Sequence, residues 1–207
     1  MAKKRVLVLN GSFCEAPIIK KAKEMGMYVI TTGNAPNLIG HQYADEYIPA
    51  DYSDKEKVLQ IVKDNDIEGV ISCANDFGVL TAAYVAEQMG WPGYDKYEIA
   101  KLLHHKNLFK QYVYKHNIPA PHSYCPEDKA DALNYIKQIE YPIIVKANDL
   151  TGGKGIRRAN TYEEAVEAVD YSYEKSRDKH IVIEPFVIGT QHTYCLLYTS
   201  PSPRDTR

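Results

Sequence analysis

Several features that would assign a protein to a particular class are scarce or missing in this 207-residue sequence. Its four cysteines stand far apart, without metal-ligand spacing, which predicts free thiols in a reducing compartment. They are Cys14, Cys73, Cys125 and Cys195. No apolar run reaches the ~20 residues of a membrane-spanning helix, and the M-A-K-K-R start lacks the apolar core of a signal peptide. With a formal net charge of only −2, no basic surface for nucleic acid is expected. The sequence therefore predicts a cytoplasmic protein with no membrane and no nucleic acid among its partners.

Residues 1–94 alternate short apolar runs with helical patterns. The apolar runs cover 5–10, 28–32 and 69–73, and the helical patterns cover 16–25, 55–63 and 77–89. Strand, helix and strand joined by short turns indicate a parallel α/β unit. A dinucleotide-binding Rossmann domain is excluded, because the turn after the first strand reads N-G-S-F-C-E-A and lacks the G-x-G-x-x-G pattern. The second strand also ends in Thr31-Thr32, where that domain has an acidic residue.

Polar residues follow the strands of this unit, at the sheet edge where open α/β sheets bind their ligands. Asn10 and Gly11 follow the first strand and are expected only to make a turn. Asn75 and Asp76 follow the third strand, in C-A-N-D-F-G, and two interpretations of them stay open. In one they contact a substrate, and in the other they supply turn chemistry alone.

The second half of the chain carries the densest pattern of candidate binding residues. Two β-type runs, Ile143–Val145 and Ile181–Ile183, flank a glycine-rich loop and a charged helical segment. The first run ends in Lys146 and the second in Glu184. Because side chains alternate along a strand, Ile144 and Lys146 are expected on one face. An apolar wall that leads to a cation is a suitable surface for a nucleotide base and its phosphates.

The loop between these elements reads T-G-G-K-G-I. A glycine-rich turn lets backbone N–H groups approach a phosphate closely, and Lys154 adds a positive charge. A Walker loop is excluded, because Gly155 stands where a serine or threonine follows the lysine in that motif. Taken alone, this loop would fit an ordinary hairpin, and Lys146 would fit a lysine whose charged end reaches water.

Helical patterns surround this stretch. One continuous helix-like segment runs from 96 to about 116 and contains H-K-N-L-F-K, followed by N-I-P-A-P, where two prolines oppose further helix. Residues 128–139 form an amphipathic pattern that leads into the first β run. After the glycine loop, Thr161 is expected to cap another helix, with Glu164 three residues on.

Taken in order, these features resemble the first part of an ATP-grasp domain. The resemblance rests on Lys106 in H-K-N-L-F-K, on Lys146, on the T-G-G-K-G-I loop and on E-P-F-V from Glu184. It implies that ATP is bound by Lys106, Lys146, Thr151, Gly152, Gly153, Lys154, Gly155, Ile156, Glu184, Pro185, Phe186, Val187 and Gln191. At the position of Gln191 many members have a glutamate that contacts the ribose. The charge is absent here, although an amide can still bond a hydroxyl.

The expected fold class is α/β: a Rossmann-like (pre-ATP-grasp) parallel-sheet domain over 1–94, then the first part of an α+β ATP-grasp domain over 95–194. The resemblance is to carbamoyl-phosphate-synthase-like and biotin-carboxylase-like members. It implies an ATP-dependent ligase that converts a carboxylate into an acyl phosphate. An amine or thiol then displaces the phosphate from this intermediate. ATP and Mg²⁺ are the implied cofactors, small-molecule carboxylates and amines the implied partners, and a homodimer is compatible with it. A non-catalytic nucleotide-binding or regulatory module is the alternative.

Residues 195–207 read C-L-L-Y-T-S-P-S-P-R-D-T-R and continue neither a strand nor a helix pattern. This tail resembles a translated sequencing adapter, and a native proline-rich linker is the alternative. We therefore expect the ATP-grasp domain to be incomplete, with its Mg²⁺ ligands in a missing second half. No catalytic residue and no metal ligand is assigned in this chain, which by itself is expected to be inactive.

Overall fold

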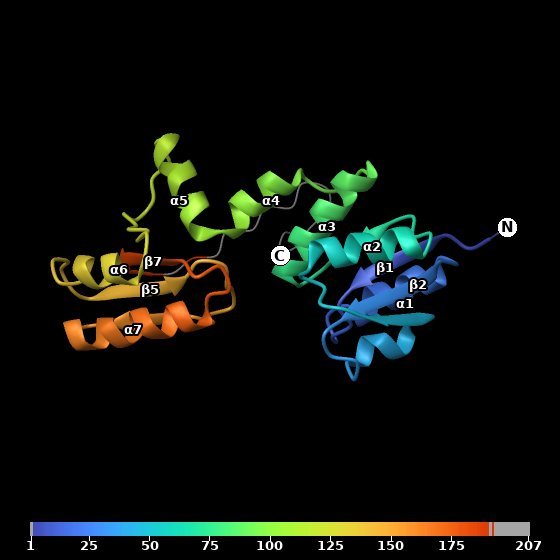
Figure 1. Ribbon diagram of the computed structural model, residues 1–207, viewed down its shortest axis with the longest axis horizontal. Coiled ribbons are helices and arrows are strands. Elements are labelled where there is room, and N and C mark those ends of the chain that lie inside the picture. The colour runs from blue at the N-terminus through green and yellow to red at the C-terminus, as the bar shows by residue number, and fades with distance from the viewer. Residues whose placement is uncertain (1, 191, 193–207) are drawn as a thin grey trace, which may run out of the picture.

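The structure, a computed structural model, describes residues 2–190 and 192. Within these residues, the chain forms a four-stranded parallel sheet and a separate three-stranded antiparallel sheet. Figure 1 shows the parallel sheet and its helices in blue to green, and the antiparallel sheet with α6 and α7 in yellow to red. A parallel sheet followed by an α+β part confirms the predicted fold class.

The parallel sheet has the strand order β3-β2-β1-β4. The strands are β1 (Arg5–Leu9), β2 (Tyr28–Gly33), β3 (Glu46–Pro49) and β4 (Val70–Ile71). The helices are α1 (Ala16–Glu24), α2 (Lys55–Asp64) and α3 (Asp76–Met89). Leu7 and Leu9 pack in one core cluster with α2 and α3, whereas Val6 and Val8 pack in another with α1. Strand β1 is therefore buried on both faces, as a parallel sheet covered by helices requires.

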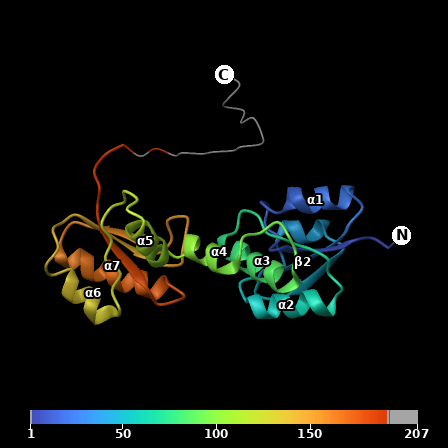
Figure 2. The same cartoon turned by 90° about the horizontal axis from the view of Figure 1, so that it is seen from above.

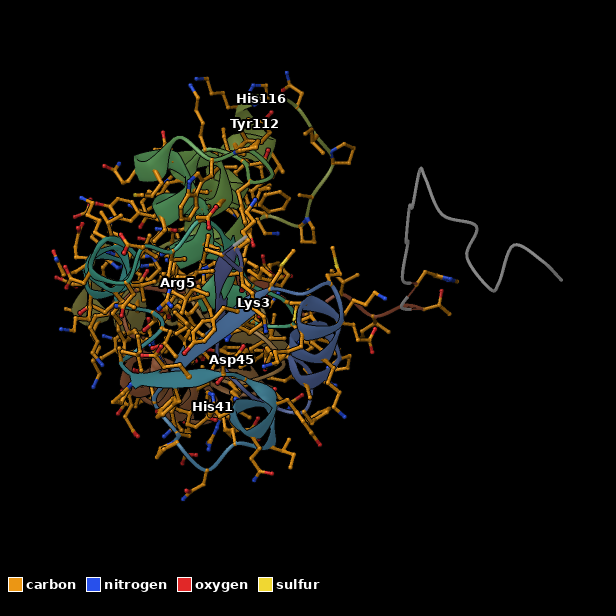
Figure 3. The ribbon with its side chains drawn as sticks, turned by 90° about the vertical axis from the view of Figure 1, so that its right-hand side faces the viewer. Lys3, Arg5, His41, Asp45, Tyr112 and His116 are labelled. Atoms are coloured by element: carbon orange, nitrogen blue, oxygen red, sulfur yellow. The ribbon has the colours of Figure 1, made fainter. Side chains whose placement is uncertain are left out.

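A short 3-10 helix, η1 (Ile39–Tyr43), packs against the turn that follows β1. The backbone N–H of Gly40 donates to the carbonyl of Gly11 at 2.7 Å. The ring of His41 in η1, labelled in Figure 3, packs at a tilt against that of Tyr47 in β3, with 4.3 Å between ring centroids. A Cβ on Gly11 would lie 2.3 Å from the His41 ring. Gly11 therefore allows this close packing, beyond making the expected turn. The sequence analysis missed η1 and also β3, because E-Y-I-P offers only one aliphatic residue.

The prediction of one continuous helix over 96–116 is wrong, because the structure has two helices. They are α4 (Tyr97–His104) and α5 (Lys106–Lys115). At His105 between them the backbone is extended, with φ −84° and ψ 119°. The carbonyl of Asn148 accepts from the N–H of Lys106 at 3.2 Å, and its side chain accepts from the N–H of Asn107 at 2.8 Å. This distant residue thus satisfies N–H groups that the first turn of a helix leaves free. Figure 2 shows α4 between the two parts of the molecule.

The antiparallel sheet has the order β6-β5-β7. Its strands are β5 (Ile143–Ala147), β6 (Ile156–Ala159) and β7 (Ile181–Pro185), and its helices are α6 (Lys129–Tyr135) and α7 (Tyr162–Lys175). Ile143, Val145, Ile181 and Ile183 are buried in one core cluster with α6 and α7. Figure 1 shows α7 on one side of this sheet and α5 on the other.

The predicted strands β5 and β7 are confirmed, and so is the helix that Thr161 caps, since the Thr161 hydroxyl accepts from the N–H of Glu164. Two details differ. Helix α6 ends at Tyr135, and residues 136–138 form a turn instead of further helix. Strand β6 was not predicted, because I-R-R-A has no clear alternation of apolar and polar residues. In the described part of the chain, no helix is both long enough and apolar enough to span a bilayer.

Candidate functional site

Four side chains define a surface that we call the α5 face. Because the odd-numbered residues of β5 and β7 are buried against α6 and α7, their neighbours project from the opposite side of the sheet. These neighbours are Ile144 and Lys146 of β5 with Val182 and Glu184 of β7. The register pairs Ile144 with Glu184 and Lys146 with Val182. Apolar and charged side chains therefore alternate over the α5 face, as the strand period predicts.

Glu184 is the most buried charged group of this face, with only 4% of its surface exposed. Its Oε2 accepts a hydrogen bond from the Lys146 ammonium. Its Oε1 accepts from the Ser123 hydroxyl and lies 2.7 Å from the Lys110 ammonium. Burial raises the pKa of Glu184, but the hydrogen bonds from Lys110, Lys146 and Ser123 outweigh it and leave this pKa below its usual value. The carboxylate is therefore ionised and lies between two cations from opposite walls.

The side chain of Lys106, the first residue of α5, is hydrogen-bonded to backbone carbonyls. Its ammonium donates to the carbonyls of Ala147 at 2.9 Å and Asn148 at 3.2 Å, and to that of Leu150. An ammonium has three N–H donors, so these three acceptors occupy all of them. Burial lowers the pKa of Lys106, against the charge of Asp149. In this conformation Lys106 holds the segment that leads into the glycine loop, and its contact with a phosphate stays a prediction.

The glycine loop joins β5 to β6 and has two different ends. Gly152 and Gly153 have φ of 64° and 78°, and nothing lies within 4 Å of a Cβ placed on either. Gly155 is buried, and a Cβ there would lie 2.6 Å from that of Ala147. Its carbonyl accepts from the Ala147 N–H at 2.7 Å. The outer end thus exposes backbone and the Lys154 side chain to solvent, whereas the inner end is fixed to β5. This arrangement suits close approach of an anion.

A cavity of about 630 Å³ lies between the two parts of the molecule, and we call it the inter-unit cleft. It is lined by Asn10, Tyr52, Ala74, Asn75, Asp76, Phe77, Leu150, Thr151, Gly152, Lys154 and Arg177. The Thr151 hydroxyl donates to the Asp76 carboxylate across this cleft. Asn75 caps α3, because its side chain accepts from the Gly78 N–H at 3.0 Å. Asn75 therefore caps α3 and also lines the cleft. Substrate contact by Asn75 and Asp76 stays a prediction.

Arg177 connects the two walls of the cleft a second time. Its guanidinium donates to the Ser53 hydroxyl at 2.9 Å and lies over the Phe77 ring at 4.2 Å. Its own backbone N–H donates to the buried carboxylate of Asp149 at 3.0 Å, next to the end of β5. Arg177 is thus fixed to the antiparallel sheet and reaches across to the parallel one.

The residues after Glu184 leave the sheet in different environments. Pro185 is exposed, and the Phe186 ring lies 4.3 Å from the Arg158 guanidinium. The Phe186 N–H donates to the Pro142 carbonyl at 2.9 Å. Val187 is 66% exposed, so its contact with a bound base would cover apolar surface. Ile156 begins β6 opposite Lys146. Gln191 and the tail over 195–207 lie outside the described residues.

The chain is similar in sequence and in fold to known proteins. Residues 104–201 match the sequence profile of the family described as phosphoribosylglycinamide synthetase, ATP-grasp (A) domain. The chain is 28% identical over 176 residues to the chloroplastic phosphoribosylamine–glycine ligase of Arabidopsis thaliana, covering 82% of this chain and 31% of that one. The solved phosphoribosylglycinamide synthetase of Anaerococcus prevotii matches at 27% identity and a TM-score of 0.60, over 91% of this chain and 47% of that one.

The second half of the chain, residues 104–201, is thus similar to an ATP-grasp domain. A similar fold occurs in the biotin carboxylase domain of the Hydrogenobacter thermophilus 2-oxoglutarate carboxylase, solved as a dimer with MgADP, ADP and bicarbonate. That structure matches with a TM-score of 0.68 at 20% identity, over 90% of this chain and 45% of that one. The chain spans less than half the length of each of these three proteins.

Three residues of the candidate site escaped the sequence analysis: Lys110, Ser123 and Asn148. Lys110 follows Lys106 by four residues, so both lie on one side of α5. That spacing was a usable signal, whereas nothing in the sequence connects Ser123 or Asn148 to their partners. In the described part of the chain, no group of three or more His, Cys, Asp or Glu side chains could hold a metal ion. We therefore assign no residue of this chain and no step to Mg²⁺.

Proposed function

We propose that the chain is the nucleotide-binding part of an ATP-dependent ligase, which joins a carboxylate to an amine or thiol through an acyl phosphate. The observation that carries this proposal is the α5 face, where buried Glu184 lies between Lys110 and Lys146. Glu184 balances only one of these cations. An extra positive charge beside a flexible glycine loop favours a polyphosphate ligand.

ATP fits the residues that surround this face. The half-buried Ile144 offers an apolar surface for the base, and the backbone of 185–187 offers hydrogen-bonding groups beside Glu184. Lys146 would turn from Glu184 to the nucleotide, and the exposed Lys154 would follow the loop onto the phosphates. When bound, ATP supplies the phosphoryl group that activates the carboxylate. The residues of this chain hold it, orient it and neutralise part of its charge.

The inter-unit cleft is the proposed position for the second substrate. Thr151, Gly152 and Lys154 of the loop line it together with Asn75 and Asp76, so a phosphoryl group held by the loop would face a molecule in the cleft. The matched relative from Arabidopsis thaliana is named as a ligase of phosphoribosylamine and glycine. A small amino acid is therefore the first carboxylate to test, with phosphorylated amines as acceptors.

The test combines ATP binding with trapping of the intermediate. The complete protein that contains this chain is incubated with ATP, Mg²⁺ and a panel of carboxylates, and hydroxylamine converts any acyl phosphate into a hydroxamate. We expect carboxylate-dependent hydroxamate and ADP, both lost on Lys146→Met. Tight ATP binding without hydroxamate for any carboxylate would support the non-catalytic module instead. No ATP binding at all would refute both functions.

Two narrower proposals accompany this one. Residues 1–207 alone are proposed to lack ligase turnover, because their described part holds no group of three or more side chains that could bind a metal ion. Substrate-dependent ADP release by the isolated chain would refute that. A homodimer, which the family resemblance allows, is tested by light scattering of the complete protein at micromolar concentration.

A further inference from the structure

We propose that Lys110 is a positioning residue that keeps Glu184 charge-balanced while Lys146 moves to the nucleotide. This inference rests on the proposed function, because it assumes that ATP binds at the α5 face. It assigns to Lys110 a role that involves no contact with ATP.

The geometry places the two lysines on different oxygens of one carboxylate. Lys110 approaches Oε1 of Glu184 at 2.7 Å from α5, and Lys146 donates to Oε2 from β5. The side chains of Lys110 and Glu184 are only 15% and 5% exposed, whereas that of Lys146 is 25% exposed. The pair with Lys110 is therefore the better shielded of the two, and Lys146 is the partner with more room to move.

Lys110 is also held from a second direction. Its ammonium donates to the Pro121 carbonyl at 3.5 Å, and the same carbonyl accepts from the Tyr114 hydroxyl at 2.7 Å. That hydroxyl in turn accepts from the N–H of Ser123 at 2.6 Å. Ser123 then donates to Oε1 of Glu184. Lys110 and Tyr114, four positions apart on α5, thus both act on Oε1 of Glu184. Lys110 contacts it directly, and Tyr114 holds Ser123, which donates to it.

The consequence for binding follows from the cost of an unpaired buried charge. If Lys146 turned to a nucleotide and Lys110 were absent, Glu184 would stay buried, and the Ser123 hydroxyl would be the one side-chain donor left to it among the described residues. Removing one partner of a buried ion pair is strongly destabilising, because the remaining charge is uncompensated. Without Lys110, Lys146 would therefore stay on Glu184, and the nucleotide would bind less tightly or only with uptake of a proton by Glu184.

The experiment measures ATP binding by calorimetry for the wild-type chain, Lys110→Met, Lys110→Arg and Lys115→Met. Lys115 is an exposed residue near the end of the same helix and serves as the matched control. We expect Lys110→Met to weaken ATP binding about tenfold or more, since the lost pairing is buried. Lys110→Arg should restore most of the affinity, and Lys115→Met should leave it unchanged.

Two readouts separate positioning from a merely structural effect. Titrations in buffers of different ionisation enthalpy should show proton uptake on ATP binding by Lys110→Met that exceeds that of the wild type. In a Glu184→Gln background, Lys110→Met should weaken binding less than twofold, because no charge is left to balance. An equal loss in both backgrounds would overturn the proposal, and so would unchanged affinity in Lys110→Met.

A nucleotide-free measurement keeps this inference separate from the proposed function. The unfolding free energies of Lys110→Met, Glu184→Gln and the double variant form a cycle without ATP. We expect the double variant to be more stable than the sum of the two single losses predicts. Additive losses would show that Lys110 does not hold Glu184, whatever ATP does. Coupling without any ATP binding by the wild type would instead refute the proposed function and, with it, the movement of Lys146. Should Lys110→Met not fold, Lys110→Gln takes its place in every arm.

Discussion

The hydroxyl of Thr151 in the glycine loop donates a hydrogen bond to the carboxylate of Asp76 at the start of α3, 75 residues earlier in the chain. Together with the contact between Arg177 and Ser53, it joins the two parts of the molecule around the inter-unit cleft. A loop that is anchored on the opposite wall has fewer open conformations than a free hairpin, although Gly152 and Gly153 leave its tip adaptable.

The first prediction concerns this anchor. Asp76→Ala should accelerate amide hydrogen exchange over residues 150–154 by about two- to fivefold, which corresponds to the loss of one partly exposed hydrogen bond. Thr151→Val should have the same effect, and Thr151→Ser, which keeps the hydroxyl, should not. Unchanged exchange in both Asp76→Ala and Thr151→Val would show that the bond does not order the loop in solution.

Lys146 is the subject of the second prediction. Lys146→Ala should weaken ATP binding by about 1–3 kcal/mol, the scale of a charged hydrogen bond lost from a partly buried site. Calorimetry on the complete protein is the measurement. An affinity equal to that of the wild type would exclude Lys146 as a contact of either the base or a phosphate.

A third prediction separates stability from binding at Lys106. Lys106→Met should lower the free energy of unfolding by about 2 kcal/mol or more, because it leaves the carbonyls of Ala147, Asn148 and Leu150 without their donor. Denaturant titration of this variant beside Lys115→Met measures the difference. If both variants were as stable as the wild type, these hydrogen bonds would contribute nothing, and Lys106 would be free for phosphate.

The fourth prediction follows from the buried His41 and the half-buried His104. Burial lowers the pKa of His41, against the hydrogen bond with Ala35, and burial also lowers the pKa of His104. In the unfolded chain both titrate near the ordinary value of about 6.5. As the pH falls below about 6.5, the unfolded chain binds protons that the folded chain does not, so the folded state loses stability until the lower folded pKa is reached.

We therefore expect the midpoint temperature of thermal unfolding to decrease when the pH is lowered from 7 to 5. This decrease should be smaller in His41→Gln than in the wild type. His122→Gln is the control, because His122 is exposed. An identical pH dependence in the wild type and His41→Gln would mean that His41 does not supply this pH sensitivity.

Close packing at Gly11 gives the fifth prediction. Gly11→Ala should lower the free energy of unfolding by about 1–3 kcal/mol, since its Cβ would lie 2.3 Å from the His41 ring and must displace η1. Gly69→Ala is the matched control directly before β4, because the nearest neighbour of its Cβ would be 3.8 Å away. Equal stability of the two variants would contradict the packing described here.

Local patterns predicted those parts of the fold whose partners are close in sequence or whose apolar runs are continuous. Strands β5 and β7 are such runs, and Thr161 caps α7 through its own neighbour Glu164. The break at His105 could not be predicted in this way. The residues around His105 continue a helical pattern. The acceptors for the first N–H groups of α5 belong to Asn148, 41 residues beyond Asn107.

The candidate site shows the same division. The strand period placed Lys146 beside Ile144, and the glycines around Lys154 predicted a flexible loop. The pairing of Lys110 with Glu184 depends on how α5 lies against β7, which is a tertiary relationship without a sequence signature. Family resemblance supplied Lys106, but only the structure shows that its donors are occupied by carbonyls.

Asn148 has a mechanical consequence for whatever binds between α5 and the sheet. This one residue, at the end of β5, bonds through its carbonyl and its side chain to the first N–H groups of α5, and its amide donates to Asp178 before β7. These hydrogen bonds fix the distance between α5 and the sheet before any ligand binds. A planar ring that binds there would have to fit this distance, so ligands would be selected by ring thickness. Binding would not have to bring the helix and the sheet closer together.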